Sequence, residues 1–205
     1  MRIGILIAVG LLAGVAFAED PPVPSSAEPK DPALEKRVNT LVDTLNLTDE
    51  TKTARVHDLV LNQYLALRQW QKEHEAELKV KGIKPEEKAA IIATRQPLHD
   101  KFVASLDAEL TPEQVEAVKD GMTAGKVQFT YKGYLGAIPD LTDEQKAEVL
   151  DFLKQARELA IDGVSMEEKS DIFNKYKGKI NNWLAAQGVD QKKKPKPPAT
   201  QPEAK

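Results

Sequence analysis

Apolar residues recur at three- and four-residue steps along most of the chain, a spacing that places them on one face of an α-helix. The clearest stretch runs from Asp49 to about Lys79, and others run from Thr142 to Ile161 and from Ser165 to about Gln187. We find no convincing alternation of apolar and polar residues, which a half-buried strand would show. The pattern predicts an all-α fold, a bundle of about five or six helices.

Three predicted helix starts share a local pattern in which Thr precedes acidic residues of the first turn. The hydroxyls of Thr48, Thr111 and Thr142 are suited to cap these starts. Gln114 and Gln145 stand three residues after their Thr and predict complete capping boxes. The first copy has Thr at the corresponding place, so its box is incomplete.

Glycine and proline mark the predicted helix limits. Ser165 should cap the last helix. Gly163 and Gly188 follow the last two helices, where a left-handed residue often ends a helix. A further helix from Pro85 to Asp107 contains Pro97, which removes a backbone hydrogen bond and crowds the preceding turn. We expect a kink or a break there.

The N-terminus has the three parts of a secretory signal peptide: Arg2, an apolar run from Ile3 to Val15, and Ala16-Phe17-Ala18. Residues 1–18 are therefore predicted to be removed after Ala18, leaving a secreted or periplasmic protein with no stable membrane span. The run is short for a spanning helix, which needs about 20 apolar residues. An uncleaved anchor or a buried strand is the alternative.

Prolines concentrate at both ends of the chain and set the expected domain limits. Residues 19–32 are predicted to form a disordered Pro-rich linker, residues 33–188 the helical domain, and residues 189–205 a disordered basic, Pro-rich tail. The tail either is merely solvated or contacts an anionic envelope surface.

Composition excludes several classes of function. The chain has no Cys, which removes disulfides, thiol catalysis and thiolate zinc sites. Its net charge of -3 lacks the excess of basic side chains that is expected of a protein that binds a nucleic-acid duplex.

The sequence also offers no clear metal or catalytic site. His57 and His74 are too far apart on one helix to share a metal ion, and we expect neither metal nor cofactor. Gly-Val-Ser-Met-Glu at 163–167 lacks the second Gly of a nucleophile elbow. The sequence does not exclude a pair of catalytic carboxylates, but we expect that the protein is not an enzyme.

Two groups of residues are candidate binding sites. The segment from Met122 to Pro139 holds Phe129, Tyr131 and Tyr134. Two interpretations are open: the rings contact a sugar or a partner surface, or they pack against the end of the helical bundle. Arg157 lies beside the apolar stripe of its helix and requires an acceptor. The alternatives are a structural pair with Asp162 or Asp120, or a ligand carboxylate such as a uronic acid. Further cations and amides lie nearby on the last helix, at Lys175, Lys179 and Asn181.

Several short segments follow one another along the chain: Asn46-Leu47-Thr48, Leu110-Thr111-Pro112-Glu113-Gln114, Lys119-Asp120-Gly121-Met122-Thr123, Tyr131 and Tyr134, Leu141-Thr142-Asp143-Glu144-Gln145, Ala156-Arg157-Glu158, Asp162-Gly163, and Lys175-Tyr176-Lys177-Gly178-Lys179-Ile180-Asn181-Asn182. In this order they resemble the secreted bacterial domain-of-unknown-function family 3826 over roughly residues 34–188. The resemblance implies exported helical proteins of bacteria that degrade polysaccharides, with no established activity and therefore no known functional residues that could be carried over to this chain.

A fainter similarity connects the chain with periplasmic helical chaperones that carry a repeated Leu-Thr-x-x-Gln motif, which Gln114 and Gln145 retain. The main hypothesis is a non-catalytic accessory protein that binds a carbohydrate or a protein partner. The alternative is a helical chaperone with a concave apolar surface, and the third is an enzyme with an undetected carboxylate site.

Overall fold

The structure, a computed structural model, describes residues 31–189 and contains eight α-helices and no strand within that range. This confirms the all-α fold, with slightly more helices than expected. The predicted signal peptide (1–18) and nearly all of the Pro-rich linker (19–32) and of the basic tail (189–205) lie outside the described residues. The helices are α1 (Pro32–Asp43), α2 (Glu50–Leu78), α3 (Pro85–Ala93), α4 (Gln96–Glu109), α5 (Pro112–Met122), α6 (Lys126–Ala137), α7 (Asp143–Ala160) and α8 (Met166–Ala186).

Side-chain caps begin five of the eight helices, and three of these caps, Thr111, Thr142 and Ser165, are the predicted ones. Thr111 and Thr142 form complete capping boxes with Gln114 and Gln145. The expected cap of α2 by Thr48 is wrong, because Asp49 accepts the backbone N–H of Lys52 instead. Asp is at least as good a cap as Thr, and its charge also interacts favourably with the helix dipole.

The predicted break at Pro97 is confirmed. Helix α3 ends at Ala93, and Pro97 lies in the first turn of α4, where its missing N–H is not needed. Gly188 is left-handed with φ of 76°. Gly163 is not left-handed, so that prediction is wrong. A Cβ at Gly163 would lie 2.8 Å from Cγ of Lys169, and close approach explains this glycine.

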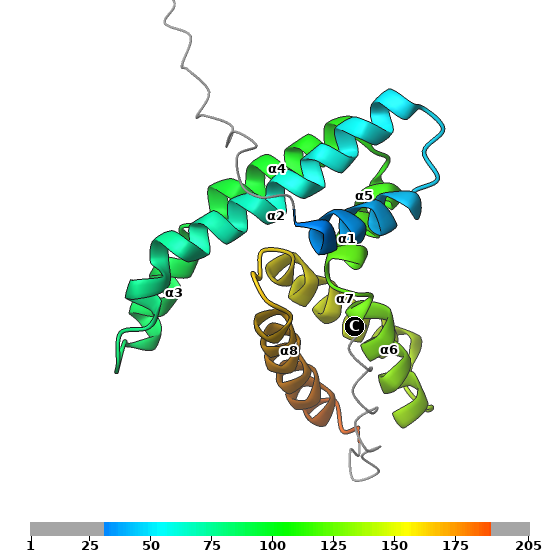
Figure 1. The fold of residues 1–205 in the computed structure, drawn as a ribbon. Helices are drawn as coiled ribbons and strands as arrows, with labels where there is room; N and C mark the ends of the chain where they lie inside the picture. Colours follow the sequence, from blue (N-terminus) through cyan, green and yellow to red (C-terminus); the bar gives the residue numbers. More distant parts are fainter. Residues whose placement is uncertain (1–30, 190–205) are drawn as a thin grey trace, which may run out of the picture.

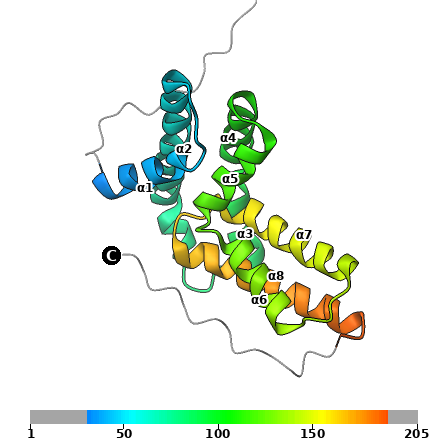
Figure 2. The same ribbon diagram turned by 90° about the vertical axis from the view of Figure 1, so that its right-hand side faces the viewer.

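The helices form two lobes with separate apolar cores (Figures 1 and 2). Helices α1, α2, α4 and α5 of the N-terminal lobe (α1–α5) surround a core that includes Val38, Val60 and Leu106. The C-terminal lobe (α6–α8) surrounds a second core that includes Leu153 and Ile180. Each fully buried side chain of this size contributes about 1.5–3 kcal/mol.

Helices α2 and α4 of the N-terminal lobe run side by side, and α3 lies at one end of this pair (Figure 1). Helix α3 has no buried residue. Trp70, in the second half of α2, is buried. The centre of its ring lies 4.2 Å from the guanidinium carbon of Arg95, and the ring stacks on that of His74. None of α1–α8 has the length and apolarity that a membrane crossing requires.

Candidate functional site

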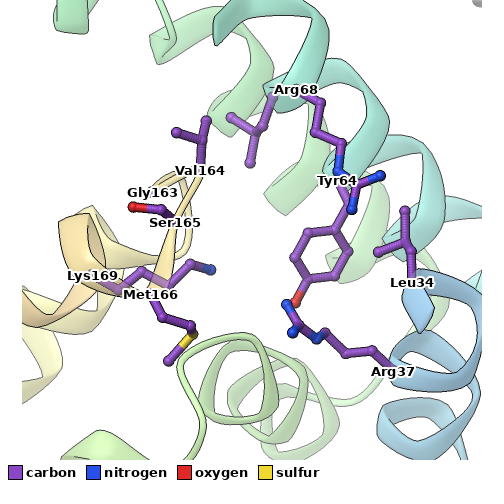
Figure 3. A pocket seen from close by; sticks show the side chains of 10 residues that line it. Leu34, Arg37, Tyr64, Arg68, Gly163, Val164, Ser165, Met166 and Lys169 are labelled. Atoms are coloured by element: carbon purple, nitrogen blue, oxygen red, sulfur yellow. The ribbon is translucent and has the colours of Figure 1, made fainter. Parts of the chain in front are cut away.

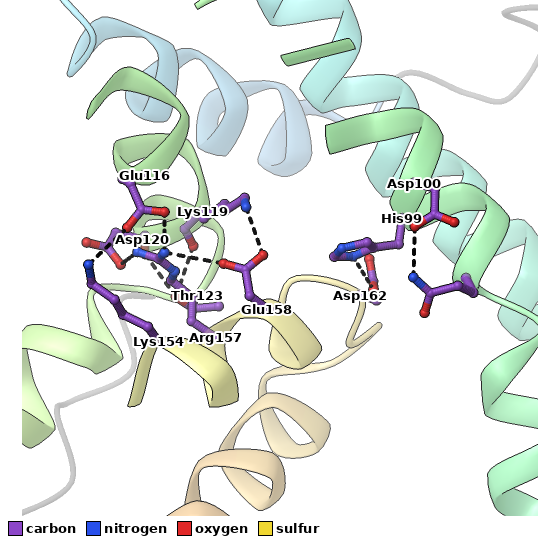
Figure 4. Close-up of polar contacts among 11 residues, drawn as sticks. His99, Asp100, Glu116, Lys119, Asp120, Thr123, Lys154, Arg157, Glu158 and Asp162 are labelled. Atoms are coloured by element: carbon purple, nitrogen blue, oxygen red, sulfur yellow. Dashed lines mark hydrogen bonds and ion pairs between the residues drawn. The ribbon is translucent and has the colours of Figure 1, made fainter. Parts of the chain in front are cut away.

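Charged side chains join the two lobes. Arg157 on α7 is 2% exposed, and its guanidinium lies 2.7 Å from Asp120 and 2.6 Å from Glu116, both on α5 (Figure 4). Lys119 on α5 pairs with Glu158 on α7 at 2.8 Å. Burial opposes the charged form of Arg157, but its bonds to Glu116 and Asp120 outweigh burial and raise its pKa. The charged side chains between α5 and α7 are therefore held in ion pairs.

A second set of polar contacts links α4 with the turn between α7 and α8. His99 Nδ1 lies 2.8 Å from Asp162 Oδ2 (Figure 4). Arg95 donates to the backbone carbonyl of Asp162 and forms an ion pair of 2.6 Å with Glu168. The hydrogen bond to Asp162 raises the pKa of His99 despite the opposing effect of burial. We call the two sets together the polar interface.

A cavity of about 40 Å³ lies beside this interface, between α1 and α2 on one side and the α7–α8 turn with the start of α8 on the other (Figure 3). We call it the interlobe cavity. Arg37 of α1, Arg68 of α2 and Lys169 of α8 line it together with Tyr64 and residues 163–166. Three of the lining side chains are cationic and none is acidic.

Lys169 is the most buried of the three cations, at 3% exposure. Its Nζ donates to the Met122 carbonyl at 2.8 Å and lies 5.6 Å from the centre of the Tyr64 ring. Burial, and next the charge of Arg37, lower the pKa of Lys169 to about 8. The ammonium therefore occupies an environment that disfavours its charge.

The two arginines of the cavity are more exposed. Arg68 pairs with Asp31 at 2.8 Å. Arg37 forms no ion pair among residues 31–189. Figure 3 shows Arg37 and Lys169 pointing toward the same space from opposite sides.

The structure brings together some of the sequence-predicted site residues. Tyr134 Oη donates to Asn181 Oδ1 at 2.9 Å and so joins α6 to α8. Burial raises the pKa of Tyr134 to about 12. Tyr131 packs partly buried against the second core. Both tyrosines thus contribute to the C-terminal lobe, while Phe129 is 38% exposed.

The other predicted residues are dispersed. Of the two acceptors considered for Arg157, the structure shows Asp120, whereas Asp162 binds His99. Lys175 and Lys179 are exposed on α8, and Lys179 lies over the ring of Tyr176 at 4.1 Å. No single cluster contains all seven predicted residues.

No cation of the interlobe cavity is among the site residues predicted from the sequence. One signal was present, because Lys169 continues the buried stripe of α8 formed by Phe173, Tyr176 and Ile180. A Lys in such a stripe requires a polar partner or a cavity. Arg37 and Arg68 carry no comparable signal, since both lie at exposed helix positions.

Metal ligation has no evident centre in the described part of the chain, where no three His, Asp or Glu side chains gather in a suitable group. His57 contacts Glu35 and Asp58, His74 bonds to the Trp70 carbonyl, and His99 pairs with Asp162. The three histidines thus serve separate local contacts.

Comparison with known proteins gives a family but no activity. The chain matches no curated protein. Residues 32–201 match the family described as "Protein of unknown function (DUF3826)". This match spans all eight helices and covers most of the chain. The chain therefore belongs to the DUF3826 family.

Proposed function

We propose that this protein is an exported, non-catalytic accessory protein that binds a saccharide ligand in the interlobe cavity. The observation that carries the proposal is the position of the cavity, whose walls come from both lobes. Ligand sites occur preferentially where two structural units meet. An interface of ion pairs also permits small adjustments between lobes more readily than a large apolar one.

Export is supported by the signal-peptide pattern of residues 1–18. The carbohydrate ligand is supported by the resemblance to exported proteins of polysaccharide-degrading bacteria. Export is tested in the native host. We expect a mature N-terminus at Glu19, detected by mass spectrometry in the periplasm or the medium.

The absence of catalysis is supported by the state of the carboxylates that contact Arg157, which are partly exposed. Arg157 fixes Glu116 and Asp120. Although burial opposes ionisation, the Arg157 hydrogen bond and charge lower the pKa of Glu116. A carboxyl group held in this way is a poor general acid near neutral pH.

The chaperone hypothesis has weaker support. Among the described residues, the exposed large apolar side chains are Val80, Phe129, Leu159 and Met166. They follow α2 or belong to α6, α7 and α8, respectively. A client-binding surface would favour a contiguous apolar patch. We therefore rank saccharide binding above chaperone activity.

The test is a thermal-shift screen of residues 19–205 with acidic and neutral oligosaccharides. A ligand at 100 times its Kd stabilises the protein by about 2.7 kcal/mol. Val164→Trp places a large ring at the cavity, and Leu159→Trp places the same ring at a 55% exposed position of α7. We expect a shift with the wild type and Leu159→Trp, but not with Val164→Trp. No shift with any saccharide would contradict the proposal.

A further inference from the structure

We infer that the interlobe cavity recognises an anionic group on its ligand, a carboxylate or a sulfate ester, through Arg37, Arg68 and Lys169. This inference rests on the proposed function and names the ligand class of the same site. Nothing in the family assignment specifies such a group.

Positive charge is concentrated at the cavity. The whole chain carries 32 acidic and 29 basic side chains, a net charge of -3, whereas the cavity walls hold three cations and no carboxylate. Asp31 pairs with Arg68 from outside these walls, but Arg37 and Lys169 form no ion pair among residues 31–189. Repulsion between Arg37 and Lys169 destabilises the empty cavity, and a bound anion would relieve it.

Lys169 is only partly satisfied by its hydrogen bonds within the protein. An ammonium group has three N–H donors, and the Met122 carbonyl takes one of them. The nearby carboxylates of Asp162 and Glu168 hydrogen-bond to His99 and Arg95, respectively. A buried cation without a direct counter-ion is costly. An anion in the cavity would supply that counter-ion.

The geometry of the interlobe cavity also fits a single anionic group. Arg37 and Lys169 face the cavity from different lobes, so a single anion between them would contact both (Figure 3). Guanidinium groups bind carboxylate and sulfate oxygens through two parallel N–H donors. The volume of about 40 Å³ holds about three waters at about 10–15 Å³ each. It therefore accommodates one oxyanion group, while the saccharide ring lies at the mouth.

The experiment compares ligands that differ only in charge. Isothermal titration of residues 19–205 uses oligogalacturonate, its methyl ester, a sulfated galactan oligosaccharide of similar length, and inorganic sulfate. We expect at least one acidic saccharide to bind at least tenfold more tightly than the neutral ester. The sulfated saccharide and oligogalacturonate together distinguish a sulfate from a carboxylate as the preferred group.

Variants locate the effect. Arg37→Gln removes an exposed cavity cation and should weaken binding of the acidic saccharide at least tenfold. Lys36→Gln removes the same charge from the neighbouring exposed position of α1, outside the cavity wall, and should change the Kd less than twofold. Lys169→Met, checked for folding by circular dichroism, should weaken binding at least as strongly as Arg37→Gln.

The outcomes separate the inference from the proposed function. If the methyl ester binds as tightly as the acid and Arg37→Gln binds normally, the inference is wrong while saccharide binding stands. If inorganic sulfate binds in an Arg37-dependent manner and no saccharide does, the anion site stands and the proposed function fails. If neither sulfate nor any saccharide binds, both fail.

Discussion

His99 Nδ1 lies 2.8 Å from the Asp162 carboxylate, which joins α4 of one lobe to the turn that ends α7 in the other. The side chains are 17% and 16% exposed, so water screens the pair only partly. Asp162 also accepts a hydrogen bond from Arg95 through its backbone carbonyl. One residue of the turn therefore anchors the C-terminal lobe to α4 by two different atoms.

Stability should depend on pH through this pair. The Asp162 hydrogen bond raises the pKa of His99 above its ordinary 6.5, with burial and Lys119 opposing and Glu158 assisting. A raised folded-state pKa stabilises the protein fully below about pH 6.5, and this contribution is lost as pH rises through the folded-state pKa. Urea unfolding should show a larger gap between wild type and His99→Gln at pH 5.5 than at pH 8.5. An equal gap at both pH values would refute this.

Arg157 should be needed for folding stability. Arg157→Ala leaves Glu116 and Asp120 close together without their shared cation. We expect a loss of about 2 kcal/mol, because truncation of a buried side chain leaves a cavity and two like charges side by side, while water still reaches the partly exposed carboxylates. Urea denaturation measures it. The control is Arg55→Ala, whose pair with Glu109 is solvent-exposed and should matter little. Equal losses for the two variants would contradict the structural role of Arg157.

Gly163 should tolerate no larger residue. In Gly163→Ala the new Cβ would meet Lys169 Cγ at 2.8 Å and the Ala160 carbonyl at 3.2 Å. We expect destabilisation of about 1–3 kcal/mol, as in other overpacked sites. Gly178 in α8 has open space around its Cβ position. Gly178→Ala should therefore stabilise by about 0.5–1 kcal/mol. Thermal unfolding of both variants gives the comparison, which fails if their signs agree.

The repeated Leu-Thr pattern should differ in energy between its copies. Thr142→Ala removes the side chain that accepts the Gln145 N–H, at a cost of about 1 kcal/mol. Thr48→Ala should cost little, because Asp49 is the cap of α2. Chemical denaturation of the two variants tests the assignment. A larger loss for Thr48→Ala than for Thr142→Ala would show that the cap of α2 is misassigned.

Binding of an acidic saccharide should weaken at alkaline pH. Burial, and next Arg37, lower the pKa of Lys169 to about 8, while Asp162 and Glu168 act in the opposite direction. In the free protein the ammonium is therefore mostly present below about pH 8 and mostly lost above it, so the affinity for an anion falls as pH rises above 8. Titrations of oligogalacturonate between pH 6.5 and 9.5 should show this decline in the wild type. Lys169→Met should give weak binding with little dependence on pH, and a decline identical to wild type would exclude Lys169.

Local sequence determined the helices and many of their limits. Caps such as Thr111 and Thr142 and the break before Pro97 depend on residues within four positions of each other, so each could be predicted. The same logic failed at Thr48 and Gly163. In the first case a neighbouring carboxylate competes for the cap, and in the second the constraint is contact with Lys169.

The sequence by itself therefore determined an all-α chain, the family to which it belongs and the position of Arg157 beside the apolar stripe of its helix. Only the tertiary structure decided that the apolar residues divide into two cores and that Arg37 and Lys169 face one cavity. The physical reason is range. Helical periodicity acts over a few residues, whereas α1 and α8 approach each other through packing of elements at opposite ends of the chain.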